Sequence, residues 1–221
     1  MEALIRWNSP EHGFVYPSKF IPVLEETRMI INVGKWCVKE TCRQIRDWQR
    51  KGFALVPVSV NLSAVQFKQP DIGDFLETTI RESGIDPGLL TFELTESTLM
   101  QNPEQIRALL IRLKELGVSV SIDDFGTGYS SLSYLKKLPA DNIKIDISFV
   151  RDITTNADDG AIVSSIVSMA HNLRMKTIAE GVETEEQLKI LNILRCDMAQ
   201  GFYFSKAVPT ETVEAMLTKV G

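Results

Sequence analysis

Two adjacent carboxylates, Asp123 and Asp124, lie at the end of a strand-like segment (residues 118–124) and precede a glycine-rich turn at residues 126–128. Neighbouring carboxylates at the end of a buried strand repel each other and are costly to desolvate unless a cation compensates them. A divalent metal ion is the usual cation. One of the two acids could instead cap a turn or a helix. Taken alone, the pair therefore leaves both a metal site and a capping role open.

Further polar residues fall late in other strand-like segments: Asn61, Glu93, Lys144, Asp146, Glu180 and Gln200. In barrels of parallel strands, chemistry is carried out where the carboxyl ends of the strands converge. Several carboxylates gathered there require cations. One Mg²⁺ needs only one or two protein carboxylates, so this set predicts two ions that share a bridging ligand. Two such ions suit phosphoester hydrolysis, in which Lys144 would hold the attacking water or neutralise charge on a phosphate.

The elements that must position these groups alternate along the chain between strand-like and helix-like segments, which predicts an α/β fold with a parallel sheet. Along each strand, apolar side chains alternate with small or charged ones, as in residues 118–123. A doubly wound sheet is buried on both faces and would be more continuously apolar, so we predict a TIM-like (β/α)8 barrel. Seven strand-like segments are present, one fewer than a complete barrel has: residues 2–7, 55–62, 90–95, 118–124, 142–147, 176–180 and 201–204.

Helix signals agree with this alternation. Thr184 and Gln187 have the spacing of a capping box. Ile162, Ile166 and Met169 recur at helical spacing, which predicts the buried face of a helix.

Composition excludes several classes of protein. A net charge of −5 argues against binding a nucleic acid polymer, which favours a basic face. No apolar run reaches the length of about 18 residues that crosses a membrane, and the N-terminus lacks the features of a signal peptide, so we expect a cytoplasmic segment without membrane contact. Three cysteines without CxxC spacing predict reduced thiols. With only two histidines, any metal should be hard and oxygen-ligated, such as Mg²⁺, Mn²⁺ or Ca²⁺.

An ordered set of motifs resembles the EAL-domain cyclic-di-GMP phosphodiesterase family over essentially the whole chain. Each motif is short and weak alone, but their order is specific. In chain order the motifs are EALIRW at residues 2–7, VNLS at 60–63, ELTE at 93–96, DDFGTG at 123–128, KID at 144–146, AEGVE at 179–183 and QG at 200–201.

The resemblance implies a barrel that hydrolyses cyclic-di-GMP to linear pGpG with Mg²⁺ or Mn²⁺ in bacterial second-messenger signalling. It makes one metal's ligands Glu2, Asn61, Glu93 and Asp123. Asp124 and Glu180 would hold the second metal, with Asp123 as the bridge, and Glu180 is alternatively a general base. Lys144 would contact the attacking water. The remaining roles implied are substrate binding by Arg6, Asp146, Glu183 and Gln200, and loop support by Glu96.

The resemblance also carries expectations about organisation. Residues 1–221 would form a single EAL domain that is truncated at its N-terminus, because the family's first strand precedes the EAL motif. The family forms homodimers, here expected through residues 124–132. An upstream sensor, cyclase or membrane-anchoring region is expected in the full-length protein.

Two other functions remain open. Degenerate members of the family bind cyclic-di-GMP or a partner without cleaving it, although such proteins typically lose carboxylates that this chain retains. From the residues alone, an enolase-like barrel could use Lys144 as a base beside metal-bound carboxylates. The adjacency of Asp123 and Asp124 makes the enolase-like alternative the weaker one.

Overall fold

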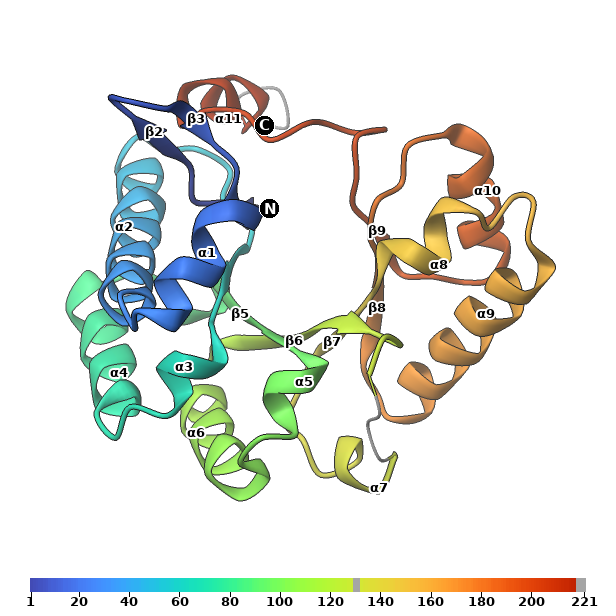
Figure 1. Ribbon diagram of the computed structural model, residues 1–221, viewed down its shortest axis with the longest axis horizontal. Coiled ribbons are helices and arrows are strands. Elements are labelled where there is room, and N and C mark those ends of the chain that lie inside the picture. Colours follow the sequence, from blue (N-terminus) through green and yellow to red (C-terminus); the bar gives the residue numbers. More distant parts are fainter. Residues whose placement is uncertain (129–131, 218–221) are drawn as a thin grey trace. The chain divides into compact units, whose positions relative to one another are not determined.

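The computed structural model describes residues 1–128 and 132–217 (Figure 1). The chain divides into two compact units. The first unit comprises Met1–Glu93, Arg112–Ser119 and Pro209–Gly221. The second comprises Leu94–Ile111 and Val120–Val208.

Three parallel strands belong mainly to the first unit. The strands β1 (Glu2–Ala3), β4 (Val58–Asn61) and β5 (Leu90–Thr95) pair in that order. The expected first strand, residues 2–7, is shorter than predicted, because the chain leaves β1 and forms an antiparallel hairpin of β2 (Trp7–Ser9) and β3 (Gly13–Val15). The helices of this unit, blue to green in Figure 1 apart from the red α11, are α1 (Pro17–Glu26), α2 (Ile30–Arg50), α3 (Ala64–Phe67), α4 (Ile72–Ser83), the 3-10 turn η1 (Pro87–Leu89) and α11 (Thr210–Leu217).

The core of the first unit forms because α2 carries buried apolar residues at helical spacing. Val38, Cys42 and Ile45 are almost completely buried, and α2 packs against both α4 and β4. On α4, Leu76 and Ile80 are buried at a spacing of four residues, which places them on one helix face. Burial of each such side chain contributes about 1.5–3 kcal/mol to folding.

Four further parallel strands belong mainly to the second unit: β6 (Ser119–Phe125), β7 (Asn142–Ile145), β8 (Lys176–Ala179) and β9 (Met198–Ala199). Before β6 lie α5 (Glu96–Leu99) and α6 (Pro103–Glu115). Between the four strands lie α7 (Leu132–Leu135), α8 (Ile147–Arg151), α9 (Ala157–Asn172) and α10 (Glu185–Ile193). The last residues of α6 and the first residue of β6 belong to the first unit.

Strand alternation correctly predicted a buried apolar face on the strands of the second unit. Val120 and Ile122 on β6, like Ile143 and Ile145 on β7, have no exposed surface. The helix α9 packs on β7 and β8. The predicted inner face of α9 is partly wrong, since Ile162 is 39% exposed and the buried residues are Val163, Ile166, Val167 and Ala170.

The last predicted strand is also displaced. Residues 201–204 form turns, closed by a hydrogen bond from Phe204 N to Gly201 O (3.1 Å), and β9 lies just before them. The run Phe202–Tyr203–Phe204 has strong β propensity, but all three side chains are exposed. The capping box is confirmed, because the Thr184 side chain accepts from Gln187 N while the Gln187 side chain accepts from Thr184 N.

The predicted α/β class with parallel strands is confirmed. Within the described residues, seven strands pair in parallel with at least one neighbour, as many as the sequence predicted. Among the helices of residues 1–128 and 132–217, none combines the length and apolar character needed to cross a membrane.

Candidate active site

The carboxyl end of β6 is irregular at the two adjacent acids. Ile122 pairs with Ile143, but the next partners are Phe125 and Ile145, so β6 uses one residue more than β7 over this stretch. Asp124 has a positive φ of 52°, a backbone conformation that costs a non-glycine residue free energy. In a regular strand, Asp123 and Asp124 would point to opposite faces. A bulge re-aims side chains, and here it brings both carboxylates into one cluster.

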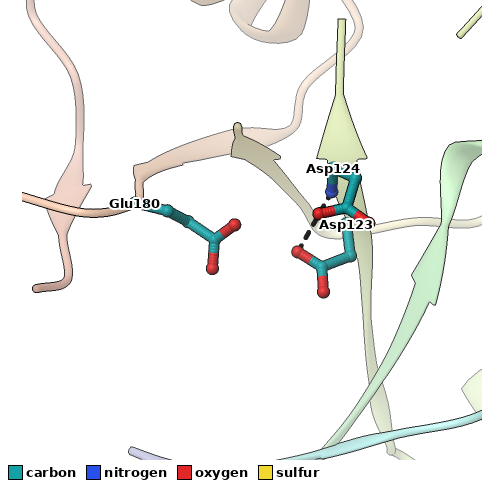
Figure 2. A group of neighbouring side chains, drawn as sticks. All are labelled: Asp123, Asp124 and Glu180. Carbon is teal, nitrogen blue, oxygen red and sulfur yellow. Dashed lines mark hydrogen bonds between the residues drawn. The ribbon is translucent and has the colours of Figure 1, made fainter. Parts of the chain in front are cut away.

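Glu180 completes that cluster from the chain segment after β8. Its backbone N donates to Ile145 O (3.1 Å), which continues the pairing of β8 with β7 one residue beyond the strand. Figure 2 shows Glu180 pointing toward Asp123 and Asp124, with Asp124 N donating to Asp123 Oδ1 (3.1 Å). One carboxylate oxygen from each of the three residues lies within 4.8 Å of the others. The structure therefore brings together three of the predicted metal ligands.

Lys144 is the cation of this cluster. Its Nζ lies 3.1 Å from Asp123 Oδ1 and 2.8 Å from Glu180 Oε1, and its side chain is only 1% exposed. Lys144 pairs with Ile178 across β7 and β8, and Glu180 lies two residues after Ile178, so strand alternation places both on the same face. A buried ammonium is tolerated only when acids pair with it.

The donor set fits a divalent metal ion. Three carboxylates and one ammonium leave a formal excess of two negative charges, which one divalent cation would balance. The donors near one another are carboxylate oxygens, the ligands that Mg²⁺ and Mn²⁺ prefer.

Glu96 holds the loop that follows the two adjacent acids. It is 3% exposed at the start of α5, and its Oε2 accepts from Gly126 N (3.0 Å) and Gly128 N (3.3 Å). Bonds from backbone N–H groups to a carboxylate are stronger than those to a neutral acceptor. These contacts are the ones that its predicted loop-supporting role requires.

The predicted substrate residues of the second unit are connected to the cluster through the chain or, for Gln200, through a backbone hydrogen bond to the end of β8. Asp146 caps α8, where its side chain accepts from Ser148 N (2.9 Å). Gln200 follows β9, and its N donates to Ala179 O (2.8 Å). Glu183 is exposed, and its N donates to Gln187 Oε1 (2.7 Å).

The other predicted ligands belong to the first unit. Asn61, at the end of β4, pairs in register with Glu93 on β5, and its Nδ2 donates to Glu2 Oε1 (2.7 Å). Glu2 pairs with Ser59, two residues before Asn61, so Glu2 and Asn61 share a face. Arg6 is exposed, with its guanidinium donating to the Ile5 carbonyl (2.9 Å).

Comparison with known proteins identifies the family. The EAL domain model matches residues 1–207. The bifunctional diguanylate cyclase/cyclic di-GMP phosphodiesterase MucR of Pseudomonas aeruginosa is 43% identical over 215 residues, covering 97% of this chain and 31% of MucR. The cyclic di-GMP phosphodiesterase NbdA of the same species is 41% identical over 217 residues, covering 98% of this chain and 28% of NbdA. The chain thus spans less than a third of the length of these relatives.

A solved structure shows the same architecture. The PaMucR phosphodiesterase in complex with c-di-GMP matches with a TM-score of 0.92 at 43% identity, over 96% of this chain and 86% of that one. The predicted TIM-like type of α/β fold is therefore confirmed. The chain belongs to the EAL domain family.

Proposed function

We propose that this chain is a metal-dependent phosphodiesterase that hydrolyses cyclic-di-GMP to linear pGpG. The observation that carries the proposal is the cluster of Asp123, Asp124 and Glu180, in which one carboxylate oxygen of each residue lies within 4.8 Å of the others and the buried Lys144 pairs with Asp123 and Glu180. Relatives at 41–43% identity carry the name of this activity. Residues 1–221 would act as one EAL domain.

Two Mg²⁺ or Mn²⁺ ions are the proposed cofactors. Asp123, Asp124 and Glu180 would hold one ion, and Asp123 would also ligate the other. The remaining ligands of that other ion would be Glu2, Asn61 and Glu93. When bound, such ions activate water and stabilise the attacking and leaving oxygens of a phosphodiester.

The chain's own residues would bind the dinucleotide, orient the attacking water and accept its proton. The Lys144 ammonium, which lies against two carboxylates of the cluster, would orient the attacking water or a phosphate oxygen. Glu180 would ligate metal or accept the proton of that water. Arg6 would bind a substrate phosphate, for which its planar guanidinium is suited. Asp146, Glu183 and Gln200 would contact the rest of the dinucleotide, and Glu96 would hold the loop that carries Asp124.

Removal of divalent metal tests this function. We expect EDTA to lower the rate of pGpG formation by more than about 10²-fold, and Mg²⁺ or Mn²⁺ to restore it. Metal at a concentration 100 times its Kd should also raise the free energy of unfolding by about 2.7 kcal/mol. Full activity in EDTA, with no change in stability on adding metal, would contradict the proposal.

We also propose a homodimer formed through residues 124–132. Residues 129–131 of this segment lie outside the described residues. Next to them, Leu132 is 62% exposed and lines an apolar hollow with Ser133, Lys136, Met169, Asn172 and Leu173. Leu132→Asp should shift the chain to a monomer, as measured by light scattering at several concentrations. An unchanged mass would contradict this assignment.

The relatives are longer than this chain and suggest regulation by attached domains. The name of MucR combines a cyclase with a phosphodiesterase, and this chain covers only part of that protein. We propose that the full-length protein likewise carries a sensor or cyclase domain.

A further inference from the structure

Ile147 lies against the chain segment that carries Glu180. Strand alternation predicts that Ile147 follows Ile143 and Ile145 into the core, but it is the first residue of α8 and is 48% exposed. A Cβ atom built on Gly181 would lie 2.1 Å from Ile147 Cγ1 and 2.3 Å from Ile147 Cδ1. The side chain of Ile147 therefore occupies the space beside the Gly181 backbone that any other residue at position 181 would fill.

Gly181 is where the chain turns after the candidate metal cluster. The strand β8 ends at Ala179, and Gly181 has a positive φ of 71°, which glycine adopts without a steric penalty. The residues on either side of Gly181 continue the strand pairing: Glu180 N donates to Ile145 O (3.1 Å), and Val182 N donates to Gln200 O (3.0 Å). Glycine has more backbone freedom than any other residue. A rigid side chain packed against Gly181 would therefore restrict the turn more than it would restrict another residue.

Isoleucine is suited to restrain that turn. It is branched at Cβ and has one strongly preferred χ1 rotamer in a helix. Asp146, directly before it, is fixed as the cap of α8 by Ser148 N, so Ile147 projects from a defined position. The residue is half exposed, so its burial contributes less to stability than that of a core isoleucine.

We infer that Ile147 is a positioning residue, which keeps the Gly181 turn in place and thereby holds the Glu180 carboxylate within the cluster of Asp123 and Asp124. This inference rests on the proposed function, in which that cluster binds metal. Residues that orient metal ligands typically change metal affinity or activity by about 10–100-fold when substituted.

The test compares Mn²⁺ affinity, measured by calorimetry, between wild type, Ile147→Ala and Ile147→Val. Ile147→Ala should weaken Mn²⁺ binding by about tenfold and lower kcat with little change in KM. Ile147→Val keeps the Cβ branch and should retain most of the affinity. Ile193→Ala is the matched control, because Ile193 lies on α10 and is 77% exposed. It should leave Mn²⁺ binding unchanged.

A reciprocal substitution tests the contact itself. Gly181→Ala should weaken Mn²⁺ binding strongly, and its effect should be smaller in the Ile147→Ala background, since the overlap with Ile147 is then relieved. Wild-type-like Mn²⁺ affinity in Ile147→Ala, or additive effects of the two substitutions, would overturn the inference while leaving the proposed function intact. A wild-type chain without Mn²⁺ binding would overturn both.

Discussion

Asp123→Asn is expected to lower the kcat for cyclic-di-GMP hydrolysis by about 10³-fold or more. The substitution keeps the shape of the side chain but replaces a charged oxygen with a neutral amide. Asp123 Oδ1 lies 3.1 Å from Lys144 Nζ, and the carboxylate belongs to the only group of three or more acidic, His or Cys ligands close enough to share a metal in the part of the chain that the structure describes. Hard divalent cations bind amides more weakly than carboxylates. Steady-state kinetics at saturating Mg²⁺, with Mn²⁺ affinity measured alongside, check this expectation.

Asp152→Asn is the matched control. Asp152 lies at the end of α8 in the same unit, its side chain is 53% exposed, and it forms an ion pair with the exposed Arg151. Surface pairs of this kind contribute little, so kcat should stay close to that of wild type. If Asp123→Asn retained more than a tenth of wild-type kcat, its proposed place between the two ions would be wrong.

Lys144→Met is expected to affect both rate and stability. Methionine fills similar space without the charge, so kcat should fall by about 10²–10³-fold even at saturating metal. In the metal-free chain, Asp123 and Glu180 would lose the ammonium that lies 3.1 and 2.8 Å away, and breaking a buried ion pair costs about 3–5 kcal/mol. Because both acids are partly exposed to solvent, the loss should lie at the lower end of that range. Urea unfolding in EDTA measures this loss in the free energy of unfolding.

The same substitution at Lys189 provides the comparison. Lys189 is 63% exposed on α10 and pairs with Glu185 one helical turn away. Such a pair contributes about 0.3–0.5 kcal/mol, so Lys189→Met should leave kcat and the urea midpoint almost unchanged. Equal effects of the two substitutions would show that burial and pairing of Lys144 have no special role.

Much of the fold follows from local patterns that the sequence displays directly. Alternation along β6 and β7 correctly predicted that Val120, Ile122, Ile143 and Ile145 are buried. The same alternation explains why Lys144 and Glu180 share a face. Period-two patterns can be read from sequence because each depends only on neighbouring positions in one strand.

Features that depend on two chain segments could not be predicted in this way. The bulge that brings Asp124 beside Asp123 depends on the register of β6 against β7, and strict alternation would separate these two carboxylates. Ile147 and residues 202–204 are residue types with high β propensity, yet Ile147 begins a helix and residues 202–204 form turns. At both places tertiary contacts override the β propensity. The site was therefore predictable as a set of residue types, whereas the backbone geometry that gathers them was not.

Incubation of this chain with cyclic-di-GMP and Mg²⁺, with chromatographic separation of pGpG from intact substrate and parallel measurement of cyclic-di-GMP binding, tests the proposed function most directly. We predict that pGpG accumulates with repeated turnover and that its formation stops in EDTA. Binding of cyclic-di-GMP without any pGpG would contradict the account and identify the chain as a binding module.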